Sequence, residues 1–155
     1  MTEPERTSIL WAHVGDAAEL ANLHSELFDV PWSVSTIEQL LSHPGSVSLI
    51  ARSGQPLRAV GFVIGQVAAD EAELLTVAVS KAVQRKGIGR TLVEAVGRAA
   101  KNTGARTLYL EVAADNAAAL ALYEKLGFQV SGRRKGYYGR PEEQAQDAIT
   151  MALPL

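Results

Sequence analysis

The chain has 155 residues, a formal net charge of −2 and no cysteine, and 47% of its residues are hydrophobic. This length and composition predict one globular domain over residues 1–155, and the near-neutral charge argues against a nucleic-acid-binding surface. The lack of cysteine excludes disulfides, thiolate metal ligands and a cysteine nucleophile. The histidines show no ligand spacing, so no metal site is predicted.

The first residues include acids and lack the apolar stretch of a signal peptide. No segment approaches the roughly 20 apolar residues that span a bilayer. We therefore expect a cytoplasmic protein that makes no contact with membranes.

The first third of the chain predicts one strand and two helices. Asp16 is a suitable N-cap, and apolar residues at helical spacing follow it. Pro31 disfavours helix at the residue before it and so separates the two helices. The expected elements are a strand at residues 8–14, a helix from Asp16 to Phe28, and a short helix that Ser33 or Ser35 caps and that ends at Leu41.

The middle of the chain is rich in β-branched residues and predicts three strands, at residues 46–52, 57–68 and 73–79. Their connections are too short for parallel crossovers, so the strands form a meander. The pattern then alternates between helix and strand. The expected elements are a helix at 85–102, a strand at 107–112, a helix from Asp115–Asn116 to Leu126, and strands at 128–132 and 148–153. Together these elements predict an α/β (α+β) three-layer fold with a mixed sheet.

Residues 84–90 (QRKGIGR) lie between a predicted strand and a predicted helix. The N-terminus of a helix offers unpaired N–H groups to an anion, and Gly87 and Gly89 let the anion approach the backbone. Basic residues of the segment add positive charge: Arg85, Lys86 and Arg90. The P-loop and dinucleotide-binding patterns are both absent. Taken alone, the segment predicts either a pyrophosphate site or an ordinary solvated start of a helix.

The order of the surrounding motifs favours the first interpretation. Residues 84–90 resemble the Q/R-x-x-G-x-G/A motif of the GNAT acetyltransferase superfamily. The resemblance covers about the last eighty residues and continues in register through Val77-Ala78-Val79, Leu110-Glu111-Val112, Asp115-Asn116 and residues 121–128. It implies acetyl-CoA (coenzyme A) as cofactor and a mostly antiparallel sheet of about seven strands. It also implies a splayed parallel pair of strands and about four flanking helices.

The resemblance also implies which residues bind the cofactor. In this family the strand before the loop pairs with the pantetheine chain, as in β-augmentation. The implied cofactor-binding residues are Val77, Ala78, Val79, Arg85, Lys86, Gly87, Ile88, Gly89, Arg90 and Asn116. Asn116 can equally be a helix N-cap, or serve both purposes.

Two side chains are candidates for catalysis. Asn116 and Tyr123 are seven residues apart, so they share one helix face. By resemblance, Tyr123 is the general acid that protonates the leaving thiolate; the alternative is a core aromatic. Glu111 interrupts an apolar strand and resembles the general base of the bacterial ribosomal-protein alanine N-acetyltransferases. The alternative there is a partly exposed strand carboxylate.

The acceptor is predicted from a further resemblance, to the protein N-terminal acetyltransferase branch. There, segments similar to that around Trp32 and to the pair Tyr137-Tyr138 line a peptide groove. The chain departs from this branch at Gly136, which looks inserted, and in the loop at residues 139–146. The predicted activity is direct acetyl transfer to the N-terminal α-amine of a protein or peptide, such as a ribosomal protein. Two alternatives are transfer to a lysine or a small-molecule amine, and a non-catalytic acetyl-CoA-binding module.

Overall fold

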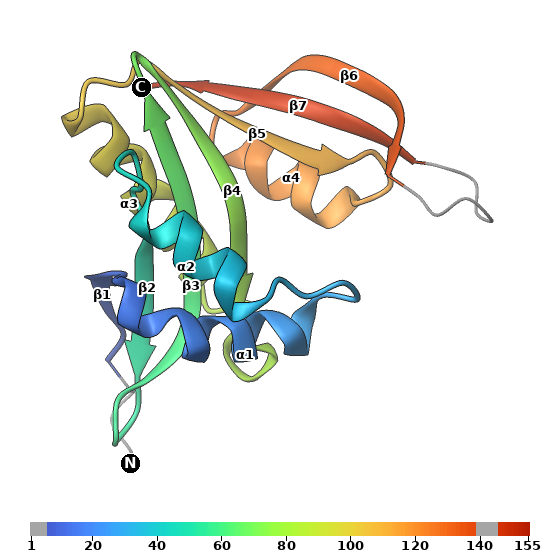
Figure 1. The fold of residues 1–155 in the computed structure, drawn as a ribbon. Coiled ribbons are helices and arrows are strands. Elements are labelled where there is room, and N and C mark those ends of the chain that lie inside the picture. Colours follow the sequence, from blue (N-terminus) through green and yellow to red (C-terminus); the bar gives the residue numbers. More distant parts are fainter. Residues whose placement is uncertain (1–5, 139–145) are drawn as a thin grey trace.

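A computed structural model describes residues 6–138 and 146–155, with side chains described over residues 6–133 and 147–155. Within these residues the chain forms a seven-stranded sheet in the order β1-β2-β3-β4-β5-β7-β6 (Figure 1). Only β4 and β5 are parallel. The predicted mixed, mostly antiparallel sheet is therefore confirmed.

The described strands are β1 (Ser8–Trp11), β2 (Leu49–Ser53), β3 (Arg58–Ala68), β4 (Glu71–Val79), β5 (Thr107–Ala113), β6 (Gln129–Tyr138) and β7 (Gln146–Pro154). The described α-helices are α1 (Ala17–Leu27), α2 (Val34–Ser42), α3 (Ile88–Asn102) and α4 (Ala117–Lys125). Short 3-10 helices cover Val14–Asp16 and Lys81–Val83. None of the described helices is long and apolar enough to cross a bilayer.

Two predicted starts of elements differ from the structure by three residues each. The helix predicted from residue 85 begins at Ile88 because Arg85 (φ 69°) and Gly87 (φ 80°) are left-handed. The strand predicted from residue 46 begins at Leu49, and Ser46 makes only an isolated bridge to Gln66. The predicted end of β1 also differs by three residues, β6 continues beyond residue 132, and other element ends differ by smaller amounts.

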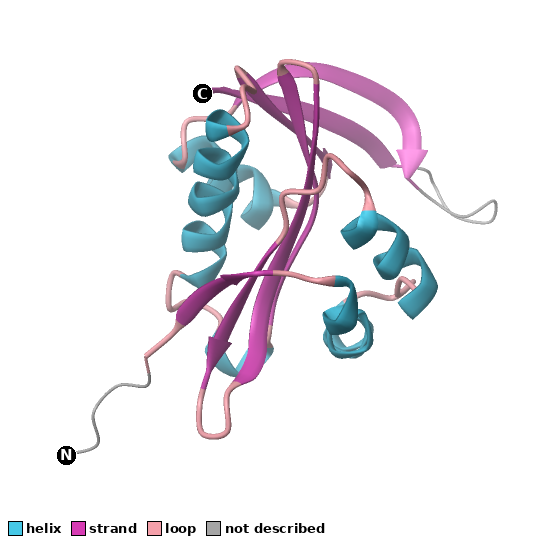
Figure 2. Ribbon diagram, turned by 60° about the vertical axis from the view of Figure 1, so that its left-hand side comes forward, coloured by secondary structure: helices cyan, strands magenta, loops and turns pink. Residues whose placement is uncertain are grey.

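The helices cover both faces of the sheet (Figure 2). One core cluster joins α3 and α4 to the sheet, and a second joins α1 and α2 to its other face. On the α3 side, Gly61 allows the helix to approach β3 closely. A Cβ at Gly61 would lie 3.2 Å from Leu92 Cδ1 and 3.3 Å from Ile88 Cγ2.

The parallel pair is only partly joined. In these two fully described strands, pairing extends over Glu71–Leu74 of β4 and 107–110 of β5 and no further. Beyond that point the strands diverge, as Figure 1 shows. The splayed pair that the family resemblance implied is therefore present.

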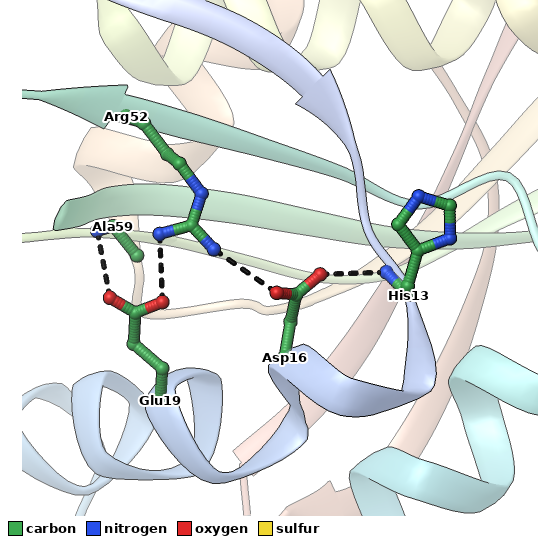
Figure 3. A network of polar contacts seen from close by, with 5 residues as sticks. All are labelled: His13, Asp16, Glu19, Arg52 and Ala59. Carbon is green, nitrogen blue, oxygen red and sulfur yellow. Dashed lines mark hydrogen bonds and ion pairs between the residues drawn. The ribbon is translucent and has the colours of Figure 1, made fainter. Parts of the chain in front are cut away.

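Asp16 occupies the N-cap position of α1, as predicted, but its side chain does not cap the helix. Its carboxylate instead accepts the His13 N–H at 2.8 Å and pairs with Arg52 at 3.1 Å (Figure 3). Arg52 also pairs with Glu19 at 2.8 Å, and Glu19 accepts the Ala59 N–H at 3.1 Å. This network joins the start of α1 to β2 and β3.

Ser33, one of the two predicted caps of α2, does act as its cap. Its hydroxyl oxygen accepts the Thr36 N–H at 3.1 Å. Ser35 lies inside the helix. The cap fixes the end of the connection between α1 and α2.

Candidate active site

Three hollows run in a row across the splayed strands. The first lies at residues 84–90 and has a volume of about 260 Å³; we call it the loop pocket. The second, the central cavity, has about 540 Å³, and the third, the outer pocket, about 330 Å³. Leu122 lines both the loop pocket and the central cavity, and Glu111 lines both the central cavity and the outer pocket.

The loop pocket combines open space with the uncapped start of a helix. No side chain caps α3, so its first amides have no partner within the helix. A Cβ added at Gly87 would meet nothing within 4 Å. Residues that line this pocket are Val79, Gln84, Arg85, Gly87, Ile88, Gly89, Arg90 and Leu122. Free N–H groups, open space and arginine charge fit a pyrophosphate group.

The polar side chains of the loop differ in how much of their charge and hydrogen-bonding capacity is available to a ligand. Arg90 Nε donates to the Glu94 carboxylate at 2.7 Å, so part of its charge is already paired. Arg85 and Lys86 are exposed, and Lys86 does not line the loop pocket. Gln84 has a role that the sequence did not reveal: its Nε2 donates to the Val79 carbonyl at 3.0 Å and holds the loop against the end of β4.

The part of β4 predicted to pair with pantetheine, residues 77–79, lies beyond the part that pairs with β5. Val77 lines the central cavity and Val79 lines the loop pocket. Ala78 is buried against α1 and α2, so only its backbone could meet a cofactor. Asn116 lines the central cavity and caps α4, where its Oδ1 accepts the Ala119 N–H at 3.2 Å.

The central cavity lies where the parallel strands diverge. Three groups of residues line it. From the first helix and the connection after it come His24, Phe28, Val30 and Trp32. From the strands come Leu74, Leu75, Thr76, Val77, Glu111, Val112 and Ala113. From α4 and its cap come Asn116, Ala119, Leu122 and Tyr123. The fold therefore brings Trp32, Glu111, Asn116 and Tyr123 to one cavity.

Tyr123 has features of both predicted roles. Its ring is 7% exposed and packs edge-on against Phe128 at 5.6 Å between centroids. It also lines the central cavity. Burial raises the pKa of Tyr123 above its ordinary value, so the hydroxyl stays protonated at neutral pH. A protonated hydroxyl is what a proton donor requires.

Glu111 has the orientation predicted from strand alternation. Its neighbours Leu110 and Val112 are buried, whereas Glu111 is partly exposed on the opposite face of β5. Its position between the central cavity and the outer pocket gives the carboxylate access to both. The other polar residues of the outer pocket are Gln66, Glu71, Glu73, Tyr109 and Thr150.

The remaining predicted residues belong to β6. Tyr137 and Tyr138 lie in this strand, and Tyr138 is opposite Gln146 of β7. Their side chains and the loop at residues 139–145 lie outside what the structure describes, so their role in binding the acceptor stays a prediction.

Several residues of the central cavity were not predicted from the sequence, among them three from the first helix and the connection after it: His24, Phe28 and Val30. One signal was present. His24 and Phe28 are four residues apart and continue the apolar stripe of the first helix from Leu20, which places all three on one face. His24 is a buried core histidine, whereas His13 and His43 are exposed.

Comparison with known proteins identifies the family. The acetyltransferase (GNAT) family matches residues 17–128. The ribosomal protein bS18-alanine N-acetyltransferase of Escherichia coli (strain K12) is 42% identical over 125 residues, 81% of this chain and 82% of that protein. The N-alpha-acetyltransferase RimI of Mycobacterium tuberculosis (strain ATCC 25618 / H37Rv) is 38% identical over 142 residues, 88% of this chain and 85% of that protein.

A solved structure agrees with these matches. The crystal structure of the ribosomal-protein-S18-alanine N-acetyltransferase from Escherichia coli superposes with a TM-score of 0.87 at 35% identity. The superposition covers 96% of this chain and 94% of the other. The predicted family and cofactor are confirmed: the chain, an acetyl-CoA-dependent N-acetyltransferase, belongs to the acetyltransferase (GNAT) family.

Proposed function

We propose that this enzyme acetylates the N-terminal α-amine of a protein in the cytoplasm. The expected acceptor is a ribosomal protein that begins with alanine, as the names of its relatives indicate. The observation that carries the proposal is the central cavity, where Glu111 from β5 and Tyr123 from α4 meet Trp32 from the connection between α1 and α2. Glu111 also lines the outer pocket, which gives an acceptor chain room on the side away from residues 84–90.

Acetyl-CoA, when bound, supplies an acetyl thioester as the electrophile. The amides of residues 85–90 and the arginines of the loop pocket would hold its pyrophosphate. The free edge of β4 at Val77 would direct the chain of the cofactor into the central cavity. Leu122, which the two pockets share, lies along this path.

Two proton transfers complete the reaction. Glu111 accepts the proton that the acceptor amine loses as its nitrogen attacks the acyl carbon. Tyr123 donates its hydroxyl proton to the sulfur as the carbon–sulfur bond breaks. Glu111 then releases its proton to water and Tyr123 takes a proton from water, so both residues return to their starting forms. The products are an acetylated amine and a free thiol.

An α-amine suits a site with one carboxylate base. With a pKa of about 7.8, roughly one-seventh of such an amine is neutral at pH 7, whereas a lysine at about 10.4 is less than one-thousandth neutral. The difference of about 2.6 units corresponds to about 3.5 kcal/mol that a lysine-modifying site has to overcome.

The test is a free-thiol assay with acetyl-CoA and peptides that begin with Ala, Ser or Met. We expect turnover on at least one of these N-termini. We also expect Glu111→Gln to reduce kcat/KM for the peptide by about 10²–10⁴-fold. Turnover of a small amine without turnover of any N-terminus would reject the proposal.

A further inference from the structure

His24 is a buried polar side chain that the proposed chemistry does not use. It is 2% exposed and lies in α1, beside the central cavity. Its imidazole stacks with the rings of Phe28 and Trp32, with centroids 4.1 and 5.0 Å apart. Phe62 of β3 packs against it at a tilt.

His24 holds both ends of the connection between α1 and α2. At the first end, the Phe28 N–H donates to the His24 carbonyl at 3.0 Å. At the second end, the Trp32 N–H donates to His24 Nδ1 at 3.1 Å. Between these points the chain turns through Val30, which is 73% exposed and also lines the central cavity. His24 therefore contacts both ends of this connection, whose residues Phe28, Val30 and Trp32 we call the rim of the central cavity.

The second of these hydrogen bonds requires neutral histidine. Nδ1 accepts the Trp32 N–H only when its lone pair is free, which places the ring proton on Nε2. In the protonated imidazolium both nitrogens carry hydrogen, and Nδ1 and the Trp32 N–H would repel each other. Burial lowers the pKa of His24 below its ordinary value and so favours the neutral form.

We propose that neutral His24 is a positioning residue that holds Phe28, Val30 and Trp32 in the shape that binds the acceptor, and that its protonation in mild acid weakens acceptor binding but not cofactor binding. The proposal rests on the proposed function in one respect, namely that this rim contacts the acceptor. Phe28, Val30 and Trp32 do not line the loop pocket that would hold the pyrophosphate, so cofactor binding should depend on them far less than acceptor binding does.

Few other groups can titrate near this site. The rings that pack against His24, those of Phe28, Trp32 and Phe62, carry no charge. Asp29 lies in the same connection. The titratable residues that line the central cavity with His24 in the described structure are Glu111 of β5 and Tyr123 of α4.

Two substitutions separate the parts of this interaction. His24→Phe keeps a stacking ring but removes the acceptor. His24→Asn places an amide oxygen near the position of Nδ1, keeps the acceptor and does not titrate. At pH 7.5, we expect His24→Phe to raise the peptide KM by about tenfold, as for one lost buried hydrogen bond, with the acetyl-CoA KM unchanged. His24→Asn should recover most of that loss.

The pH dependence is read against His24→Asn, because the acceptor amine is the same in both assays and the asparagine does not titrate. Because burial lowers the pKa of His24, the ratio of the peptide KM of the wild type to that of His24→Asn should still be flat at about pH 6.5, the ordinary pKa of histidine, and should rise at lower pH. A ratio that stays constant down to pH 5 would overturn the proposal.

A second measurement needs no substrate and so stands apart from the proposed function. In a Trp11→Phe background Trp32 is the remaining tryptophan, and acrylamide quenching reports its accessibility. We expect quenching to increase between pH 7.5 and pH 5 with His24 and to stay constant with His24→Asn. Equal increases in both proteins would refute the link between His24 and the rim. If the quenching changes as expected but the wild type acetylates no peptide, the result counts against the proposed function and not against the link between His24 and the rim.

Discussion

At the scale of single residues, Tyr123 shows how a core side chain can also carry chemistry. Its ring packs against Phe128, while the same residue faces the central cavity. Burial raises the pKa of its hydroxyl, which makes proton donation harder, so the assignment of Tyr123 as proton donor rests on its place at the central cavity.

Tyr123→Phe removes the hydroxyl and keeps the packed ring. We expect kcat to fall by about 10²-fold, with the acetyl-CoA KM and the melting temperature nearly unchanged. Tyr109→Phe is the control for kcat: Tyr109 is on β5 and lines the outer pocket but not the central cavity, so any effect should fall on the peptide KM and the loss in kcat should be far smaller. If kcat is the same for Tyr123→Phe and the wild type, Tyr123 is not the proton donor.

Glu19 illustrates the opposite effect on a carboxylate. Burial alone would raise its pKa, but hydrogen bonds from the Ala59 N–H and Arg52, together with the arginine charge, lower it below 4.5. The negative form is therefore favoured in the folded state. Glu19 contributes stability above the unfolded pKa of about 4.5, and that contribution is lost as the pH falls through the lower folded pKa.

We therefore expect Glu19→Gln to reduce the free energy of unfolding at pH 7, with a difference from the wild type that shrinks below about pH 4.5. Urea denaturation at several pH values measures this difference. Glu26→Gln, an exposed position on the same helix, serves as the control and should change little at any pH. A Glu19→Gln effect of the same size at pH 3 and pH 7 would contradict the pairing with Arg52.

At the scale of elements, the start of α3 decides how the cofactor is bound. The helical turn does not form at residues 85–87, because Arg85 and Gly87 have left-handed backbone angles. For Arg85 this conformation costs of the order of 1–2 kcal/mol, a strain that is common at functional sites. The result is a loop with exposed amides where a regular helix would have placed side chains.

Gly87→Ala tests this arrangement. The new Cβ meets no atom within 4 Å, so the stability cost, about 1 kcal/mol, comes from the backbone at φ 80°. The methyl group would also occupy the approach to the helix amides, so we expect weaker acetyl-CoA binding by calorimetry.

Gly97→Ala, in the interior of the same helix, is the matched control. Its Cβ makes an ordinary 3.6 Å contact with Leu155, so this change should stabilise the protein by about 0.5–1 kcal/mol without affecting the cofactor. Wild-type cofactor affinity in Gly87→Ala would show that the loop pocket is not the pyrophosphate site.

At the scale of the whole molecule, the parts that the sequence predicted are those with local causes. The alternation in β5 and the apolar stripe of α3 follow from neighbouring residues, and so they could be read directly. What escaped prediction depends on contacts between distant segments. Asp16 was expected to cap α1 but pairs with Arg52, 36 residues away. The sequence showed only that His24 lacks the spacing of a metal ligand, because its role depends on where Trp32 lies.

The order of the pockets also emerges only at this scale. The loop pocket, the central cavity and the outer pocket belong to different segments, and shared lining at Leu122 and Glu111 joins them. A cofactor at one end and an acceptor at the other would meet between β4 and β5. We propose that the acceptor that reaches this point is an N-terminal α-amine.

A competition experiment tests that claim most directly. Two peptides of one sequence that begins with Ala and contains one lysine are mixed in equal amounts with the enzyme and acetyl-CoA. One peptide has a free N-terminus and an acetylated lysine, and the other has a trideuteroacetylated N-terminus and a free lysine, so mass spectrometry distinguishes the two substrates and their two products. We predict acetylation of the free N-terminus with a preference of at least about 100-fold, in line with the difference in amine pKa. Equal acetylation of the two peptides, or a preference for the lysine, would contradict the proposed function.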